Sequence, residues 1–513
     1  MWNFLKANKY VLLLWILILA YIAYFSYFSI LRYKTLYASY YDLGIMHQTV
    51  FNTYKAISTG DYSRFLELTN PLNSEQIKRM AIHNDPLLAL LAPFYFIHSG
   101  PETLLILQSI FSAIGAFALF NIGKEVFRKN KYVEAIAFVF AVSYLLYNPL
   151  QRANTFEFHA VVFATSGLLF MFYFWLVKRY WWSFVFFILS LLAKEQIALV
   201  TMMFGLYILI LNLRVKKLKP KSINKIDLNF GILLIILSLI WFILSVFYII
   251  PLFRGGHHFA TERYSELGDS PAKAILNVVT NPLILSRYFF RLETWSYVIN
   301  LLSPVGLLSL LAPLQLAMAV PEFAINILSQ NGRMRYLIYH YTAVITPFVF
   351  ISALYGMRNL LTLKNSKPGG LFKKLGDAGM TKLLIIYLLF FTLYLAYMKG
   401  PLPFAKGKNI HPFKYVAKEW RDTAFWGRTL KDENLKISTT GQLSPYFTSR
   451  RYFYTFSDRY KLADYVIVRL NEIYNYPEKN ELIPQYEDLI QNQNYRLIYQ
   501  RENFEVYKKI IND

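Results

Sequence analysis

The first stretch of this chain that could do chemistry is "YYDLGIMHQTVFN", which begins at Tyr40. Its acid, Asp42, comes shortly after a long apolar run and stands among aromatic residues, followed by Leu43 and Ile45. A carboxylate in such a place can accept a proton or hold a divalent ion. Asp42 is also a good N-cap for a helix that starts beside it, so the sequence leaves a catalytic and a structural interpretation open.

Polar residues of both charge signs recur between the later apolar runs. An ionised group at the centre of a bilayer costs at least about 2.5–3.5 kcal/mol, so such residues normally face water, protein or one another. A polar chamber that opens to one side of the membrane would explain why they gather at one predicted boundary. They are His83, Asn84 and Asp85 in "AIHNDPLL"; Glu157 and His159 in "NTFEFHAVV"; Lys194 and Glu195 in "LLAKEQIAL"; and Arg333, Arg335, Tyr336, His340 and Tyr341 in "NGRMRYLIYHYTA".

Taken singly, these residues also have structural interpretations. The Lys-Glu pair at residues 194–195 can flank a short span at the membrane interface. His159 and His340 can be hydrogen-bonded residues at helix ends. The arginines of residues 333–335 can extend to lipid headgroups. None of these interpretations explains why both signs of charge meet on one face. For a phosphate ligand, Arg335 is the best candidate because a guanidinium binds phosphate with two parallel hydrogen bonds.

The composition indicates a membrane protein that crosses the bilayer several times. The 513 residues are 56% hydrophobic and 18% aromatic, which is too apolar for a soluble enzyme. The net charge of +23 comes mainly from Lys and Arg in short loops between apolar runs, where it indicates topology rather than nucleic-acid binding. The chain has no cysteine, which excludes disulfides, thiolate catalysis and zinc-thiolate sites.

The apolar runs predict about eleven transmembrane helices, with the N-terminus in the cytoplasm. The first run, 10–30, lacks a small-residue cleavage site and is expected to stay as an anchor. We expect two short spans within 297–328, divided at Pro313, because a single span would place the basic segment 364–382 outside. The remaining spans are predicted at 102–120, 135–150, 161–177, 181–192, 197–213, 230–250, 337–360 and 383–397.

Two parts of the chain fit no span. Residues 32–99 are predicted to be an external loop with interfacial helices, because "DPLLALLAPFYFIHS" is too short to cross a bilayer. Residues 400–513 are predicted to form a small extracytoplasmic α/β domain, which leaves 1–399 as the transmembrane domain. Its strands are expected at "NLKISTT", "RYFYTF", "ADYVIVRL", "YRLIYQ" and "FEVYKK", and its helices near 413–426 and 481–492.

Seven fragments, in this order, resemble a prokaryotic membrane-protein family called domain of unknown function 2079. The resemblance covers Tyr41 to about Ile510, nearly the whole chain. At a greater distance the family resembles the GT-C superfamily of glycosyltransferases. The fragments are "YYDLGIMHQTVFN", "HNDPLLALLAPFY", "ANTFEFHAVVFA", "LAKEQIAL", "YHYTAVITPF", "LSPYFTSRRYFYTF" and "ADYVIVRL".

The resemblance implies a fold, a reaction and a location. The fold is an α-helical, polytopic, GT-C-like membrane domain with a small external α/β domain. GT-C enzymes take a sugar from a polyprenyl-phosphate donor on the outer face, and they use a carboxylate in the first external loop, where Asp42 stands. The implied protein is therefore an integral-membrane glycosyltransferase of a prokaryotic plasma membrane, with an unidentified acceptor.

Site residues follow from combining the resemblance with the residue chemistry. We expect Asp42, Glu157 and His159 to be catalytic. A divalent cation, Mg²⁺ or Mn²⁺, would be held by Asp42, Glu157 and His83. Residues expected to bind the substrate are His83, Lys194, Glu195, Arg333, Arg335, His340 and Tyr341.

This chain departs from the family pattern at three positions. His47 stands where a second acid is usual, Ala160 replaces a proline, and Gln196 stands where an acid is frequent. These changes put a two-carboxylate metal site in the first loop in doubt. Two other functions stay open: a transporter or flippase of a lipid-linked sugar or other solute, and an assembly protein that works through its external tail. The absence of internal repeats gives an inverted-repeat transporter no support.

Overall fold

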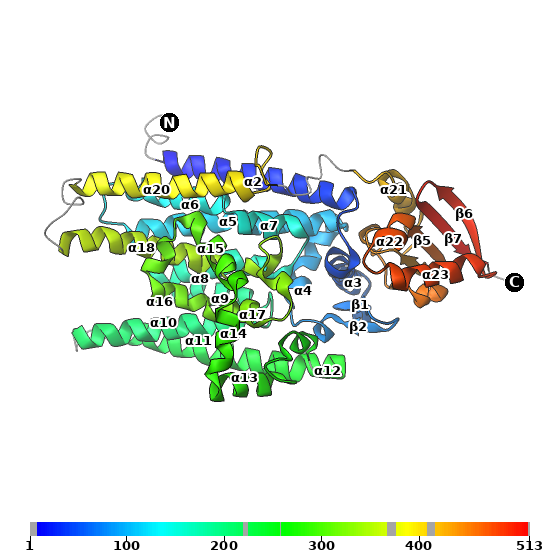
Figure 1. Cartoon of the computed structure of the whole chain (residues 1–513), viewed down its shortest axis with the longest axis horizontal. Helices are drawn as coiled ribbons and strands as arrows, with labels where there is room; N and C mark the ends of the chain where they lie inside the picture. Colours follow the sequence, from blue (N-terminus) through cyan, green and yellow to red (C-terminus); the bar gives the residue numbers. More distant parts are fainter. Residues whose placement is uncertain (1–7, 219–223, 257, 367–375, 408–415, 511–513) are drawn as a thin grey trace.

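The computed structural model describes residues 8–218, 224–256, 258–366, 376–407 and 416–510. Apolar helices from the first 400 residues lie side by side, and a small domain with a sheet lies at one end of them (Figure 1). The principal helices of this bundle are α2 (Lys9–Lys34), α5 (Pro101–Val126), α6 (Val133–Leu145), α7 (Asn148–Phe156), α8 (Phe163–Leu176), α9 (Tyr180–Leu191), α10 (Ile197–Leu218), α11 (Lys225–Ile243), α18 (Thr346–Ser366) and α20 (Gly376–Lys399).

Five helical segments of the described chain are long and apolar enough to cross a membrane. Each contains or overlaps a predicted span, whereas the total of about eleven spans stays a prediction. The five are Lys9–Lys34, Pro101–Val126, Val133–Phe156, Lys225–Arg254 and Gly376–Lys399. Shorter apolar helices occur at Leu87–Phe96, Ala160–Leu176, Tyr180–Leu191, Ile197–Leu213 and Pro313–Leu328.

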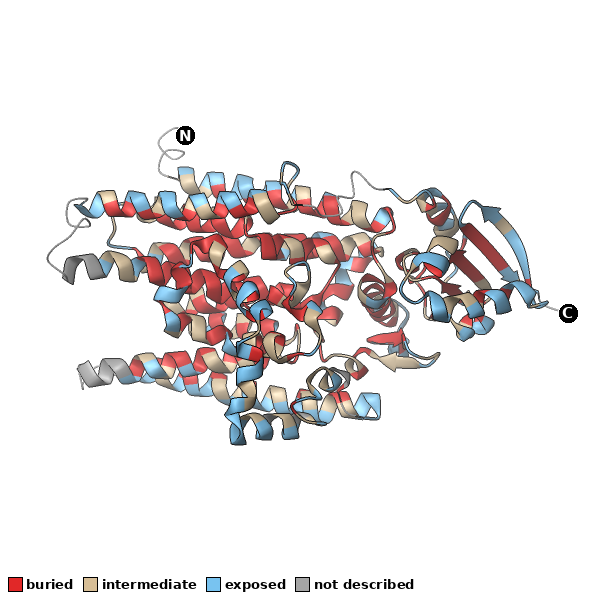
Figure 2. Cartoon of the chain, in the orientation of Figure 1, coloured by how far each residue is buried: buried red, intermediate tan, exposed pale blue. Residues whose placement is uncertain are grey.

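Close packing of α10 against α11 depends on two glycines. A Cβ on Gly205 would lie 2.7 Å from the carbonyl oxygen of Gly231, and a Cβ on Gly231 would lie 3.0 Å from that of Gly205. Small residues at such crossings let two apolar helices approach closely in lipid. This pair presents much of its other surface outward, whereas the middle of the bundle is buried (Figure 2).

The segment that the sequence divides at Pro313 is broken in the structure. Helix α15 (Leu292–Leu302) is followed by 3₁₀ turns, and α16 (Pro313–Leu316) and α17 (Val320–Leu328) come after them. The prediction of one helix over 337–360 is wrong at its start, because α18 begins at Thr346 and the preceding residues are irregular apart from a 3₁₀ turn. Pro347 explains this boundary, since proline suits the first turn of a helix and breaks its interior.

The first predicted loop is built from short elements. A π-helical turn, η1 (Tyr40–Gly44), leads into α3 (Ile45–Thr59), followed by the hairpin of β1 (Glu67–Thr69) and β2 (Gln76–Lys78). The apolar piece expected to lie at the interface forms α4 (Leu87–Leu91) and a 3₁₀ turn. Other short helices are α12 (Ile250–Arg254), α13 (Pro271–Thr280) and α14 (Ser286–Phe289).

All five strands expected in the C-terminal region are present. They are β3 (Ile437–Thr439), β4 (Phe453–Thr455), β5 (Tyr465–Arg469), β6 (Tyr495–Arg501) and β7 (Phe504–Lys509). The sheet has the order β4-β3-β5-β7-β6; β3 is parallel to β4 and β5, and the other pairs are antiparallel. Its helices are α21 (Trp420–Thr429), α22 (Leu470–Asn475) and α23 (Lys479–Gln491). Residues 413–415 of the predicted first helix lie outside the described residues.

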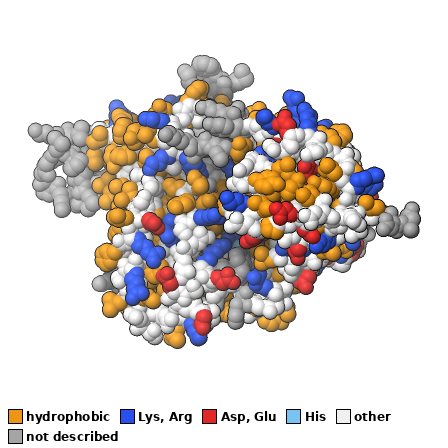
Figure 3. Space-filling model, turned by 45° about the vertical axis from the view of Figure 1, so that its right-hand side comes forward, with side chains coloured by type: hydrophobic (Ala, Val, Ile, Leu, Met, Phe, Trp, Pro, Cys, Tyr) orange, Lys and Arg blue, Asp and Glu red, His pale blue; other side chains and the backbone are white. Residues whose placement is uncertain are grey.

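Edge strand β4 docks against the first loop. The backbone N–H of Phe453 donates to Oγ1 of Thr69 over 3.2 Å, and Nε2 of Gln48 donates to the carbonyl of Arg451 over 3.0 Å. Arg451 also donates to Glu67 over 2.8 Å. Acidic and basic side chains are mixed at this end of the molecule (Figure 3). The sheet edge is therefore covered by the chain that follows α2.

Candidate functional site

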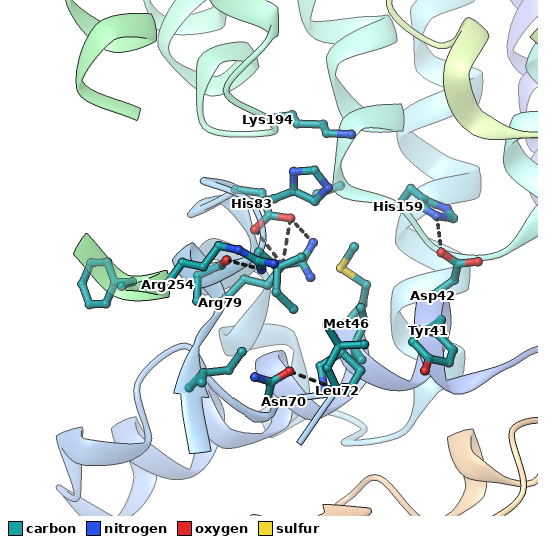
Figure 4. Close-up of a pocket in the computed structure, with 18 of the residues that line it drawn as sticks. Tyr41, Asp42, Met46, Asn70, Leu72, Arg79, His83, His159, Lys194 and Arg254 are labelled. Atoms are coloured by element: carbon teal, nitrogen blue, oxygen red, sulfur yellow. Dashed lines mark hydrogen bonds and ion pairs between the residues drawn. The ribbon is translucent and has the colours of Figure 1, made fainter. Parts of the chain in front are cut away.

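A cavity of about 840 Å³ lies at the end of the bundle that carries the C-terminal domain. Its walls come from the first loop, from the segments after α7 and α9, and from residues 253–256, 262–263 and 340–341. Figure 4 shows Arg79, His83 and Lys194 at one side of the cavity and Asp42 with His159 at the other. Segments far apart in the sequence thus bring cations, acids and histidines to one hollow.

Asp42 lies in the π-helical turn that follows α2. Its Oδ1 is 3.0 Å from Nε2 of His159, and its side chain is 30% exposed, so a ligand in the cavity can reach it. Burial alone would raise the pKa of Asp42, but His159, with Arg79 adding to the effect, holds this pKa below its usual value. Asp42 is therefore ionised at neutral pH and accepts the proton of His159 Nε2.

His159 is held in place from two sides. Its ring stacks on that of His340, with the centroids 3.6 Å apart, and its backbone N–H donates to Gln108 over 2.8 Å. The Nδ1 atom is buried and has no hydrogen-bond partner within the described residues. The stacking and the Asp42 contact fix the imidazole with one nitrogen toward the carboxylate.

Glu157 lies behind this pair and outside the lining of the cavity. Its Oε2 accepts hydrogen bonds from the backbone N–H groups of Ser39, at 3.1 Å, and Leu43, at 2.9 Å. Burial and the nearby Asp42 carboxylate raise the pKa of Glu157 to about 8. Glu157, which the sequence predicts to be catalytic, therefore holds the turn that carries Asp42.

A second group of polar side chains contains His83, Glu195 and His258. Oε1 of Glu195 is 2.9 Å from Nδ1 of His83 and 3.2 Å from Nε2 of His258, and one ligand atom from each residue lies within 4.8 Å of the others. Oε2 of Glu195 accepts from the backbone N–H of Asn84 over 3.1 Å. Two imidazoles and a carboxylate are a donor set typical of zinc and other transition metals.

This grouping differs from the metal ligands expected from the sequence. Asp42, Glu157 and His83 do not converge, because each is committed to a different neighbour: His159, two backbone N–H groups and Glu195, respectively. Burial alone would raise the pKa of Glu195, but His83 and His258 hold it well below its usual value. Within the described residues, the group that could hold a metal ion is His83, Glu195 and His258.

Four basic side chains line the cavity: Lys194, Arg79, Arg254 and Arg263. Arg79 is committed to Asp85 by hydrogen bonds of 2.7, 2.9 and 3.1 Å. Within the described residues, the Lys194 ammonium makes no hydrogen bond or ion pair. Burial lowers the pKa of Lys194, and the carboxylates of Glu195 and Glu322 oppose this effect. The Lys194 ammonium is therefore the cation best placed to meet an anionic ligand.

Two arginines chosen from the sequence lie outside the cavity lining. Arg335 is buried and donates to the carbonyl of Ser329 over 2.8 Å and to Glu293 over 3.2 Å. Arg333 is exposed. His340 and Tyr341, from the same segment, do line the cavity, because the chain turns between Arg335 and His340.

The sequence reasoning missed several residues that shape the site. Arg79 stands four residues before His83, whereas Arg254 and His258 fall in "FRGGHH", just after the apolar run that ends at Ile250. Arg79 could have been predicted as a site residue, because it is close in sequence to His83, which the sequence analysis selected. Nothing local marks the "FRGGHH" segment, because its role depends on how α12 folds back onto the first loop.

His47, which stands where the resemblance led us to expect a second acid, does not line the cavity. Its Nδ1 is 2.7 Å from the hydroxyl of Tyr95, and its Nε2 is 2.8 Å from Oγ of Ser449 in the C-terminal domain. Burial lowers the pKa of His47 to about 3, so it is neutral. His47 therefore joins the first loop to the C-terminal region, and it makes no contribution to the cavity wall.

Comparisons with known proteins agree with this architecture. The sequence pattern of a family described as "Predicted membrane protein (DUF2079)" matches residues 32–506. The crystal structure of ArnT from Cupriavidus metallidurans bound to undecaprenyl phosphate is similar, with a TM-score of 0.57 and 12% identity, and the match covers 99% of each chain. Its apo state gives a TM-score of 0.46 and 12% identity over 91% of this chain and 93% of that one.

The likeness to the lipid-bound ArnT structure shows a shared fold, as the GT-C resemblance led us to expect. A search of curated proteins found no match.

Proposed function

Because the chain belongs to the DUF2079 family of predicted membrane proteins, we propose that it is an integral-membrane glycosyltransferase. It transfers a sugar from a polyprenyl-phosphate donor to an acceptor hydroxyl on the outer face of a prokaryotic plasma membrane. One observation carries this proposal: Asp42, His159 and Lys194 all line the same cavity. The fold shared with an ArnT structure that holds undecaprenyl phosphate supports the class of donor.

In the proposed reaction, the acceptor hydroxyl attacks the anomeric carbon of the sugar. The bond from this carbon to the acceptor oxygen forms, the bond to the phosphate oxygen breaks, and polyprenyl phosphate leaves. Asp42 takes the hydroxyl proton, and His159 keeps the carboxylate ionised and oriented. The partial exposure of Asp42 supports this role, because an acceptor must approach it from the cavity.

The leaving phosphate would be stabilised by cations of the cavity wall. Lys194 is the principal candidate, and Arg254 and Arg263 line the same space. Cations in a site that excludes bulk water stabilise developing negative charge more strongly than they would in water. Arg335 keeps a supporting role in this proposal, because its hydrogen bond to Ser329 fixes the segment that leads to His340.

We also propose that His83, Glu195 and His258 hold a divalent cation. Two nitrogen ligands and one carboxylate favour Zn²⁺ over the Mg²⁺ or Mn²⁺ expected from the sequence. A bound ion would add positive charge to the cavity wall beside Lys194. His83 lines the cavity, whereas Glu195 and His258 lie outside its lining, and Glu195 contacts both histidines.

A photoreactive analogue of undecaprenyl phosphate tests the donor site. Cross-linking to the purified full chain should fall at least about ten-fold in Lys194→Gln, because one phosphate-binding cation is lost. Lys406→Gln, which removes an exposed lysine outside the cavity, should label like the wild type. Equal labelling of Lys194→Gln and wild type would contradict the proposed donor site.

The absence of cysteine makes the proposed orientation testable in cells. Leu72→Cys lies on the cavity rim and should react with an impermeant maleimide from outside. A cysteine at Lys131, near the other ends of the helices, should react only after the cells are opened. Labelling of both positions from the same side would refute the proposed topology.

A further inference from the structure

A second cavity, of about 920 Å³, lies at the opposite ends of the helices from the C-terminal domain. It is formed by the end of α5 and the loop after it, by the end of α8, by residues 355–362 of α18 and by the first residues of α20. Figure 1 shows the end of α18 and the start of α20 at the left, away from the sheet domain. This cavity is therefore separate from the candidate active site.

Basic side chains dominate the charged lining. The cations are Arg128, Lys129, Lys131 and Arg358, and the acids are Glu125 and Asp377. Within the described residues, none of the four cations forms an ion pair with a carboxylate. Arg358 lies over the ring of Tyr355 at 4.5 Å from its centroid, which holds the guanidinium at the wall. The cavity thus offers unneutralised positive charge in a concave setting.

Topology alone does not account for this arrangement. The positive-inside rule requires Lys and Arg near the cytoplasmic ends of spans, but it does not require them to line a common hollow. Here residues separated by more than 200 positions in sequence, Arg128 and Arg358, meet at one cavity. A concave group of cations is suited to bind phosphate groups.

The surroundings favour phosphate carried by a lipid over free phosphate. The first turn of α20 lines the cavity through the exposed Ala378, and the exposed side of the same helix continues with apolar side chains. Exposed fractions are 46% for Leu383, 64% for Ile386 and 61% for Phe390, at the spacing of one helix face. Acyl chains can lie along this face while a headgroup occupies the cavity. Tyr132 and Tyr355 add rings of the kind enriched at membrane interfaces.

We propose that this cavity binds the headgroup of an anionic phospholipid from the leaflet that is predicted to face the cytoplasm. Arg128, Lys129, Lys131 and Arg358 contact the phosphate, and the exposed face of α20 carries the acyl chains. Basic pockets between transmembrane helices on the cytoplasmic side bind such headgroups in other membrane proteins. The bound lipid bridges α5, α18 and α20, so it stabilises this end of the bundle.

Native mass spectrometry of the full chain in neutral detergent tests the proposal. Cardiolipin, phosphatidylglycerol and phosphatidylcholine are added separately, and the bound fraction is compared. The wild type should prefer the two anionic lipids by at least about ten-fold, because several cations of the cavity face the headgroup. Changing Arg128, Lys129, Lys131 and Arg358 to Gln should abolish this preference.

Three further arms keep the result interpretable. The matched variant with Lys418, Arg421, Arg496 and Lys508 changed to Gln removes the same charge from the C-terminal domain and should keep the preference. Arg358→Gln alone should reduce it about three-fold even if the quadruple variant fails to fold. If both Arg358→Gln and the quadruple variant keep the full preference for anionic lipids over phosphatidylcholine, the proposal is overturned. Inorganic phosphate that displaces the lipids at equal phosphate concentration would assign the cavity to a soluble phosphate and overturn the lipid assignment.

Discussion

Oδ1 of Asp42 lies 3.0 Å from Nε2 of His159, although 117 positions separate the two residues in the chain. The contact joins the turn after α2 to the segment after α7. Gln108 of α5 fixes this segment, since its side chain bonds the backbone of Glu157 and of His159. The pair is therefore set by three parts of the bundle, and its geometry is available before any substrate arrives.

Replacing His159 with glutamine should shift the acid limb of the pH–activity profile. Asp42 must be ionised to accept a proton, and His159 lowers the pKa of Asp42. Without the imidazole this pKa rises, so activity should be lost at a higher pH as the solution is acidified. The transfer rate measured across pH checks this shift. His98→Gln, at an exposed histidine outside the cavity, should leave the profile unchanged, and an unshifted profile in His159→Gln would contradict the role of His159.

Glu157 should make the fold less stable at alkaline pH. Its pKa is raised from 4.5 to about 8 in the fold, so the folded state holds the proton more tightly than the unfolded chain does. The stabilisation from this group is therefore complete below about pH 4.5 and is lost as the pH rises through about 8. Thermal unfolding of the wild type, followed across this range, should show the loss.

Two variants separate the charge of Glu157 from its hydrogen bonds. Glu157→Gln keeps an oxygen acceptor for Ser39 and Leu43 and should lose the alkaline decline. Glu157→Ala leaves two buried N–H groups without this acceptor and should destabilise the fold by about 1–3 kcal/mol at every pH. An alkaline decline that persists in Glu157→Gln would assign it to another group.

The apolar helices and the five strands could be predicted from the sequence because each has a clear physical cause. Long apolar runs must form helices in lipid, and alternating β-branched and aromatic residues marked the five strands. Asp42 was recognisable because it follows the first run so closely. Arg254 and His258 were not, since neither lies in a predicted span or in a motif, and only the folding of α12 against the first loop brings them to this end of the bundle.

Side-chain direction was harder to predict than the position of a segment. Arg335 and His340 are five residues apart, yet only His340 lines the cavity. The backbone between them leaves the 3₁₀ turn Gly332–Arg335 and enters a second turn at His340, and no periodic pattern predicts such a change of direction. The grouping of Glu195 with His83 and His258 was not predicted for a related reason, because tertiary contacts bring these three residues together.

The protein purified without chelators should contain about one Zn²⁺ per chain, held at nitrogen and carboxylate ligands. His258→Ala should lower the metal content at least about ten-fold. Elemental analysis by mass spectrometry gives the count, and His98→Ala provides a histidine control whose ring lies outside the cavity. Zinc that survives in His258→Ala, or Mg²⁺ and Mn²⁺ found in its place, would refute the assigned ligands.

Arg459 of the C-terminal domain should hold one wall of the cavity in place. Its guanidinium donates to the backbone carbonyls of Pro71, at 3.2 Å, and Asn73, at 3.4 Å, in the β1–β2 hairpin that lines the cavity. In an Ile77→Cys background, where the cysteine replaces a partly buried residue of the hairpin, Arg459→Ala should raise the rate of maleimide labelling at least about five-fold, because two hydrogen bonds to the loop are lost. Arg496→Ala, at an exposed arginine of β6, should not change the labelling.

Equal labelling rates for Arg459→Ala and its parent would show that the hairpin keeps its position without the hydrogen bonds of Arg459. Partial recovery of slow labelling in Arg459→Lys would support a contact through the charged donor, since lysine can still reach one carbonyl.

Sugar transfer by Asp42→Asn in proteoliposomes is the most direct test of the proposed reaction. The substrates are undecaprenyl-phosphate-linked sugars extracted from the cells that produce the protein, and covalent product is counted per mole of protein. Asparagine keeps an oxygen near His159 but cannot take the proton, so transfer should fall about 10²–10⁴-fold, whereas Glu487→Gln, at an exposed carboxylate of α23, should match the wild type. Transfer by Asp42→Asn at the wild-type rate, or movement of the lipid-linked sugar across the bilayer with no covalent product from the wild type, would contradict the account.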